Sequence, residues 1–119
     1  SLDKTKYQNV RRPLTFFLLN IKSLVKRQIL YLKARVQEKL GNFEEAKRLY
    51  QSVYENFGQD ILADNALFRS ALINLQVLEK KEEALVLFEK IILEYNSSLF
   101  VSRARGYYLN LMSDNSQSQ

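Results

Sequence analysis

The sequence contains no cysteine and no histidine, and both absences restrict the chemistry available to it. Without cysteine there can be no disulfide and no thiolate metal site. Without histidine the chain lacks the commonest general base and the commonest metal ligand. The lysines, tyrosines, serines and carboxylates that remain form no recognisable catalytic motif. We therefore assign no catalytic, cofactor-binding or metal-binding residues, and we expect a protein that is not an enzyme.

Proline and glycine are also scarce, with one proline and three glycines in 119 residues. So few turn-forming residues favour an all-α fold over a sandwich of short strands. The longest apolar block, residues 14–21, is interrupted by Thr15 and Asn20 and is far shorter than the ~20 residues that cross a bilayer. The first residues show no apolar run of the kind found in a signal peptide.

The net charge of +5 is distributed unevenly along the chain. Residues 1–48 hold twelve Lys/Arg against four Asp/Glu, whereas residues 49–119 hold six against nine. A basic first third can attract an acidic partner, or it can simply be a solvated helix surface. Binding to nucleic acid is less favoured, because Phe16 and Phe17 lie in an apolar run and are not interleaved with the basic residues. Attraction to an anionic membrane surface is similarly disfavoured.

The most informative feature present is an internal repeat of 38 residues. Residues 44–50 return as 82–88, and residues 60–67 return as 98–105, with rings replacing rings and small residues replacing small ones. A fixed period between about 20 and 50 residues is typical of stacked helical units. Such arrays commonly serve as binding scaffolds, although the repeat itself does not identify the ligand.

Apolar residues at helical spacing, with start and stop signals between them, predict about six helices. Pro13 suits the first turn of a helix, and Gly41 suits a left-handed stop. Asn42 and Glu45 have the spacing of a capping box, while Asp60 and Ser98 are placed to cap later helices. The predicted helices span residues 13–24, 25–39, 43–57, 61–78, 81–95 and 99–112.

These elements divide the chain into three parts. Residues 1–12 are polar, basic and without periodicity, so we expect a flexible arm. Residues 13–112 form the helical repeat domain. Residues 113–119 are a polar tail that we expect to be disordered. An array that opens on a partial unit fits a fragment of a longer protein, and the sequence leaves that question open.

The repeated small and aromatic residues resemble those of the tetratricopeptide repeat family. The matching residues are Ala34, Ala46 and Tyr50 in one unit and Ala71, Ala84 and Phe88 in the next. Residues 40–46 are also close to the family's inter-helix turn. The resemblance implies helical hairpins stacked in a right-handed superhelix, with units at about 27–60 and 61–98 and flanking helices at 13–24 and 99–112. It further implies a scaffold that binds a protein or peptide in a concave groove.

A narrower resemblance concerns residues 58–69 and 84–101. These segments are similar to the C-terminal repeats of exported bacterial envelope proteins of the same family. This resemblance implies a periplasmic or outer-membrane-associated location.

Three arginines recur every 34 residues, at positions 35, 69 and 103. In the resembled family the first helices of successive units line the groove, where guanidinium groups could bind the carboxylates of an acidic partner. The alternative is that these arginines pair with Glu38, Asp64 or Glu94 or reach into solvent. The neighbouring rings Tyr31 and Phe68 could anchor a partner, and the alternative favoured for them is packing between adjacent helices. With the neighbouring aromatic residues, the hypothetical partner-binding set is Tyr31, Arg35, Phe68, Arg69 and Arg103.

A second function remains open from sequence alone. The ends of a repeat array expose core residues unless a polar face caps them. The chain could therefore be a self-associating structural module, either a homo-oligomer or a domain-swapped assembly. The acidic pairs Glu44/Glu45 and Glu82/Glu83 are interpreted as structural, because negative charge in the first turn of a helix is favourable.

Overall fold

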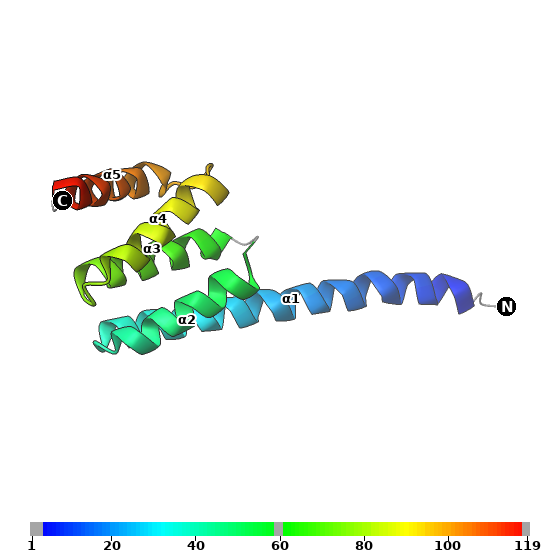
Figure 1. Cartoon of the computed structure of the whole chain (residues 1–119). Helices are drawn as coiled ribbons and strands as arrows, with labels where there is room; N and C mark the ends of the chain where they lie inside the picture. The colour runs from blue at the N-terminus through cyan, green and yellow to red at the C-terminus, as the bar shows by residue number, and fades with distance from the viewer. Residues whose placement is uncertain (1–3, 59–60, 118–119) are drawn as a thin grey trace.

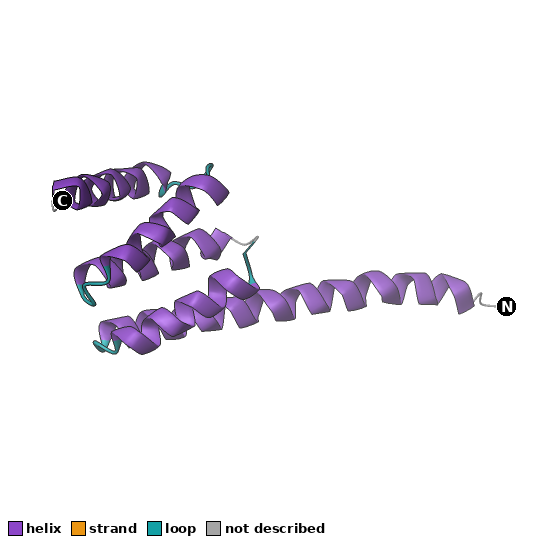
Figure 2. Ribbon diagram, in the orientation of Figure 1, coloured by secondary structure: helices purple, strands orange, loops and turns teal. Residues whose placement is uncertain are grey.

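The computed structural model describes residues 4–58 and 61–117, and within those ranges the chain forms helices and no strands. The helices are α1 (Lys4–Lys39), α2 (Phe43–Asn56), α3 (Ile61–Gln76), α4 (Lys81–Glu94) and α5 (Val101–Gln117). Figure 1 labels them in chain order, and Figure 2 shows short turns between α1 and α2, between α3 and α4 and between α4 and α5. None of these helices combines the length and apolar character needed to cross a membrane.

The helices stack in sequence, so that each one packs chiefly on the next. The result is an elongated molecule of 81 × 31 × 18 Å. The C-terminal half of α1 pairs with α2, and α3 pairs with α4, as two successive hairpins. The N-terminal half of α1 extends well beyond the other helices, which is plain in Figure 1.

Alanines at the helix crossings let the backbones approach closely. Ala46 and Ala84, which are equivalent in the two repeats, are completely buried, and so are Ala34, Ala66 and Ala71. The core divides into two clusters, one centred on Tyr50 between the first hairpin and α3, the other on Phe88 between α3, α4 and α5. The small-small-aromatic pattern in the sequence therefore corresponds to close packing between helices.

The structure corrects the predicted helix count from about six to five over the described residues. Segments 13–24 and 25–39 are one continuous helix, because no glycine or proline lies between them to end it. α1 also begins at Lys4, inside the predicted flexible arm, and α5 continues to Gln117, inside the predicted disordered tail. The two lysines, two arginines and one glutamine of the arm favour a helix and are compatible with this extension.

The predicted helix signals are confirmed only in part. Gly41 has a φ of 83°, so it adopts the left-handed conformation expected at the end of α1. The capping box is wrong, because the Asn42 side chain donates to Gln37 and makes no cap hydrogen bond. Ser98 does accept the backbone N–H of Phe100 through its hydroxyl, just before α5. The predicted cap at Asp60 lies outside the described residues.

Candidate partner-binding groove

A hollow of about 350 Å³ lies on one side of the helical stack. α1, α2 and α3 supply nearly all of its lining, and one ring comes from the segment just before α5. Two of the predicted site residues from α1 and one from α3 lie here together. The lining residues are Tyr31, Arg35, Glu38, Lys39, Tyr50, Asn65, Arg69 and Phe100.

Arg69 binds Glu38 through two nitrogen atoms of its guanidinium group. Its Nε donates to Glu38 Oε1 over 3.2 Å, and a terminal nitrogen donates to the other carboxylate oxygen. Tyr50 also donates to Oε1 of Glu38, over 2.8 Å. Burial raises the pKa of Tyr50 to about 12, so its hydroxyl keeps its proton to a higher pH than that of an ordinary tyrosine. Arg69 thus joins α3 to α1, which is the alternative foreseen for it.

Arg35 and Lys39 contrast with Arg69. Both side chains are exposed, and both line the same hollow. Within the part of the chain that the structure describes, neither takes part in an ion pair. Tyr31 lies beside them, half-buried, with its ring edge-on to Tyr50 at a centroid distance of 5.7 Å. This end of the groove therefore offers two unneutralised cations next to an aromatic ring.

Phe68 and Arg103 belong to the predicted partner-binding set, but neither of them lines the hollow. Phe68 is only 2% exposed and stacks on Phe100 at 4.7 Å, so the prediction that it contacts a partner is wrong. It is a core residue, as the packing alternative held. The guanidinium group of Arg103 lies 4.7 Å from the centre of the Phe68 ring and does not line the hollow. Such a cation–π contact holds Arg103 against α3.

A second, larger hollow of about 660 Å³ adjoins the first and shares Asn65 and Phe100 with it. Its charged lining residues are Asp64 and Glu94. Ser98 donates a 2.5 Å hydrogen bond to Asp64, which fixes that carboxylate near the start of α5. The groove thus changes from positive near α1 to negative near the α4–α5 turn.

Sequence reasoning missed Phe100, Asn65 and Lys39 as lining residues. Phe100 could have been found from the repeat, because the segment 98–105 copies 60–67 at the start of a first helix. No signal in the sequence distinguishes Lys39 from the other lysines of the first third. Its position depends on where the last turn of α1 ends relative to α3.

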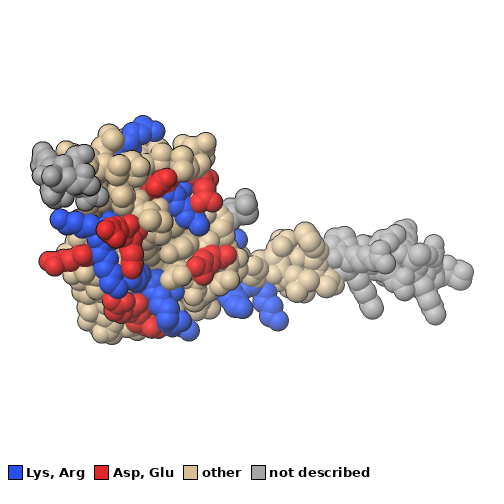
Figure 3. All heavy atoms as spheres, viewed as in Figure 1, with Lys and Arg blue, Asp and Glu red and all other residues tan. Residues whose placement is uncertain are grey.

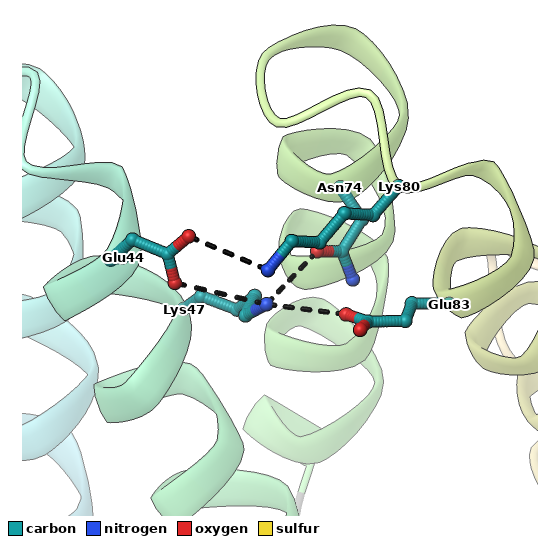
Figure 4. A network of polar contacts seen from close by, with 5 residues as sticks. All are labelled: Glu44, Lys47, Asn74, Lys80 and Glu83. Atoms are coloured by element: carbon teal, nitrogen blue, oxygen red, sulfur yellow. Dashed lines mark hydrogen bonds and ion pairs between the residues drawn. The ribbon is translucent and has the colours of Figure 1, made fainter.

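The acidic pairs have structural roles outside this groove. Lys47 of α2 contacts Asn74 of α3 and Glu83 of α4, each over 3.3 Å. Lys80 reaches Glu44 over 3.6 Å. Figure 4 shows these side chains bridging three helices. Glu45 instead pairs with Arg48, whose hydrogen bonds lower the pKa of the Glu45 carboxyl.

Comparison with known proteins bears on the fold. No curated protein and no solved structure matches the chain. The sequence profile described as tetratricopeptide repeat matches twice, at residues 28–60 and 65–98, which together make up more than half of the chain. Each match covers one hairpin, α1–α2 or α3–α4. The chain belongs to the tetratricopeptide repeat family.

Proposed function

We propose that this protein is a non-catalytic interaction scaffold that holds an extended segment of a partner protein in the groove. Tetratricopeptide repeats generally mediate contacts between proteins, which supports the scaffold role. The observation that carries the proposal is the exposed pair Arg35 and Lys39, which lies in a concave hollow without a carboxylate partner among the described residues. Carboxylates of the partner would supply the missing anions.

The charge distribution along the groove gives the partner segment a polarity. Its acidic end would lie against Arg35 and Lys39, near Tyr31. Its other end would lie beside Asp64 and Glu94, where a lysine or arginine is favoured. Asn65 and Phe100, which line both hollows, would contact the middle of the segment. A wholly acidic segment would be repelled at the second hollow.

Labelled ten-residue peptides would test this polarity by fluorescence anisotropy. One peptide carries carboxylates in one half and lysines in the other, the second carries only carboxylates, and the third carries only lysines. We expect the mixed peptide to bind most tightly and to weaken as salt is added, because exposed ion pairs are screened. Equal binding of all three peptides would contradict a groove with two charged ends.

Variants of the protein locate the binding site. Arg35→Glu should weaken binding of the mixed peptide about tenfold or more, since attraction becomes repulsion at the acidic end. Arg105→Glu is the matched control, because Arg105 is also exposed but lines neither hollow. Similar losses in both variants would show an effect of total charge and would count against the groove.

The cellular setting is a separate part of the proposal. We place the scaffold in the bacterial cell envelope, in the periplasm or at the outer membrane. The support is the resemblance of residues 58–69 and 84–101 to exported envelope members of the family. Fractionation of cells that produce the natural protein would test it, and recovery in the cytoplasmic fraction would contradict it.

A further inference from the structure

One face of α1 is apolar over residues 14–36 and is left exposed by the other helices of the described residues. Its side chains recur every three or four residues, so they form one stripe on the helix. The stripe lies opposite the face that carries Tyr31 and Ala34 and packs on α2. Its members, each between 40% and 63% exposed, are Leu14, Leu18, Ile21, Val25, Ile29, Leu32 and Val36.

In the second repeat, the equivalent face of α3 is covered by another helix, α2. The two family matches begin at residues 28 and 65, which aligns Ile29 with Ala66 and Val36 with Ile73. Ala66 and Ile73 are 0% and 3% exposed, in the cluster that α2 shares with α3. Ile29 and Val36 are 47% and 52% exposed. α1 therefore lacks the covering helix that α3 has.

The opposite end of the stack differs in character. The face of α5 turned toward α4 is apolar and buried through Ala104 and Leu111. Its outward residues Arg105, Asn110 and Ser113 are exposed and polar, whereas Leu109 and Met112 are apolar and 58% and 44% exposed. A polar outer face is what a terminal repeat needs for solubility. Among the described side chains, α5 exposes these two apolar residues whereas α1 exposes a stripe of seven, so the α1 end has the greater need of a partner.

The length of the stripe limits what can cover it. From Leu14 to Val36 it spans about 33 Å at 1.5 Å per residue. The second helices of the repeats, α2 and α4, have 14 residues each and would reach only about 20 Å. α1 has 36 residues, and among the described helices it alone is long enough.

We propose that the stripe is covered by α1 of a second copy, running antiparallel about a two-fold axis at Val25. The spacing of the stripe is the same in both directions from that residue. Antiparallel pairing therefore places Leu18 opposite Leu32 and Ile21 opposite Ile29, so that each stripe residue faces a stripe residue of the other copy. The helix dipoles also oppose each other in this arrangement. The symmetry closes at two copies, so it forms a dimer and not a filament.

This pairing gives the projecting half of α1 a function. Residues 14–21 extend beyond the repeats, as the tan segment beside the body in Figure 3 shows. Residues 29–36 lie on the outer side of the repeats. In the antiparallel pair the projecting part of each copy docks on the outer side of the other copy's repeats. None of the seven stripe residues lines either hollow of the groove, so this dimer does not rest on the proposed binding function.

Charge provides a signature for this dimer. Lys22, Lys26 and Lys33 follow one edge of the stripe, and residues 13–37 contain no Asp or Glu. In the antiparallel pair these lysines lie near those of the second copy and repel them. Added salt should therefore strengthen the dimer, because it screens that repulsion. A partner helix rich in carboxylates, or a membrane of anionic lipid, would bind more weakly at high salt.

Analytical ultracentrifugation across concentration and salt tests the dimer. We expect a concentration-dependent dimer whose dissociation constant falls on going from about 50 mM to about 500 mM salt. Leu18→Glu and Val25→Glu should each raise the dissociation constant at least tenfold. Phe16→Glu is the matched control, because Phe16 is 67% exposed on the opposite face of the same helix. A monomer at all concentrations, or equal effects of all three variants, would overturn the proposal.

Single cysteines test the register, which is convenient because the natural chain has none. Val25→Cys should form a disulfide-linked dimer on mild oxidation, since the axis places this residue against itself. Ile21→Cys alone should form little, whereas Ile21→Cys mixed with Ile29→Cys should cross-link readily. Efficient self-linking of Ile21→Cys would indicate a parallel pair and reject the antiparallel one. Sedimentation of the wild-type monomer with anionic vesicles, without dimer, would reject a second copy as the occupant.

Discussion

Gly41 and Glu79 occupy the same place in the two repeats and share a left-handed backbone. They lie 38 positions apart in the sequence, each in the turn between the two helices of a hairpin. Their φ angles are 83° and 56°. Glycine adopts this conformation freely, whereas a residue with a Cβ is strained there. The second hairpin therefore makes the turn of the first without the residue best suited to it.

Glu79→Gly should stabilise the protein by about 0.5–1 kcal/mol, because the strain is removed at a small entropic cost. Gly41→Ala should destabilise it by about 1 kcal/mol for the same reason. A Cβ at position 41 would meet no atom within 4 Å, so that cost would come from the backbone alone. Thermal and urea unfolding measure both changes. Shifts of the same sign in the two variants would contradict this explanation.

Overpacking tests the helix crossings. Ala84 is fully buried in the cluster that contains Phe68 and Phe88. Ala84→Leu should force the helices apart and cost about 1–3 kcal/mol. Val86→Leu, on the exposed face of the same helix, is the control and should leave the unfolding free energy within about 0.5 kcal/mol. Wild-type stability in Ala84→Leu would mean that the crossing tolerates a larger side chain.

Because Arg69 contacts Glu38, substitution of Arg69 should destabilise the protein. The sequence pattern alone does not predict this loss. Arg69→Glu places a second carboxylate against the partly buried Glu38. The substitution should lower the unfolding free energy by about 1–3 kcal/mol. Arg35→Glu should leave stability nearly unchanged, because Arg35 is exposed and has no ion pair in the described ranges. The double variant Glu38→Arg/Arg69→Glu should recover part of the loss. No recovery would show that the pair contributes little coupling energy.

Alkaline pH should destabilise the fold through two tyrosines. Burial raises the pKa of Tyr50 and of Tyr54 to about 12, above the ordinary value of 10.0. The unfolded chain thus loses these protons first. The stabilisation is complete below about pH 10 and is lost as the pH rises toward about 12. Urea unfolding at a series of pH values measures this loss. Tyr54→Phe should reduce it, and an unchanged slope in that variant would exclude Tyr54 as a source.

Most helix boundaries could be predicted from the sequence, because apolar periodicity and the repeat indicate the same elements. α2, α3 and α4 begin at the predicted residues and end one or two residues early. The sequence pattern did not predict that α1 is one continuous helix. Residues 14–25 are apolar on several faces, so the pattern does not show whether one helix ends there and another begins. Such a pattern cannot locate a boundary when no glycine or proline marks it.

The candidate site was less predictable because it depends on contacts between distant residues. The spacing of Arg35, Arg69 and Arg103 suggested three equivalent side chains. The structure gives each a different environment, since Glu38 lies within reach of Arg69 and the Phe68 ring lies beneath Arg103. Which arginine remains available for a partner is a property of the packing and not of the spacing.

The stacking of each helix on its neighbours in the chain also shapes how the molecule folds. Most contacts join residues that are close in sequence, and proteins with such low contact order fold faster than those built from distant strand pairings. Each hairpin can form before the next, so folding can spread along the stack from either hairpin. α5, which packs chiefly on α4, can then detach and redock while the four helices before it stay folded.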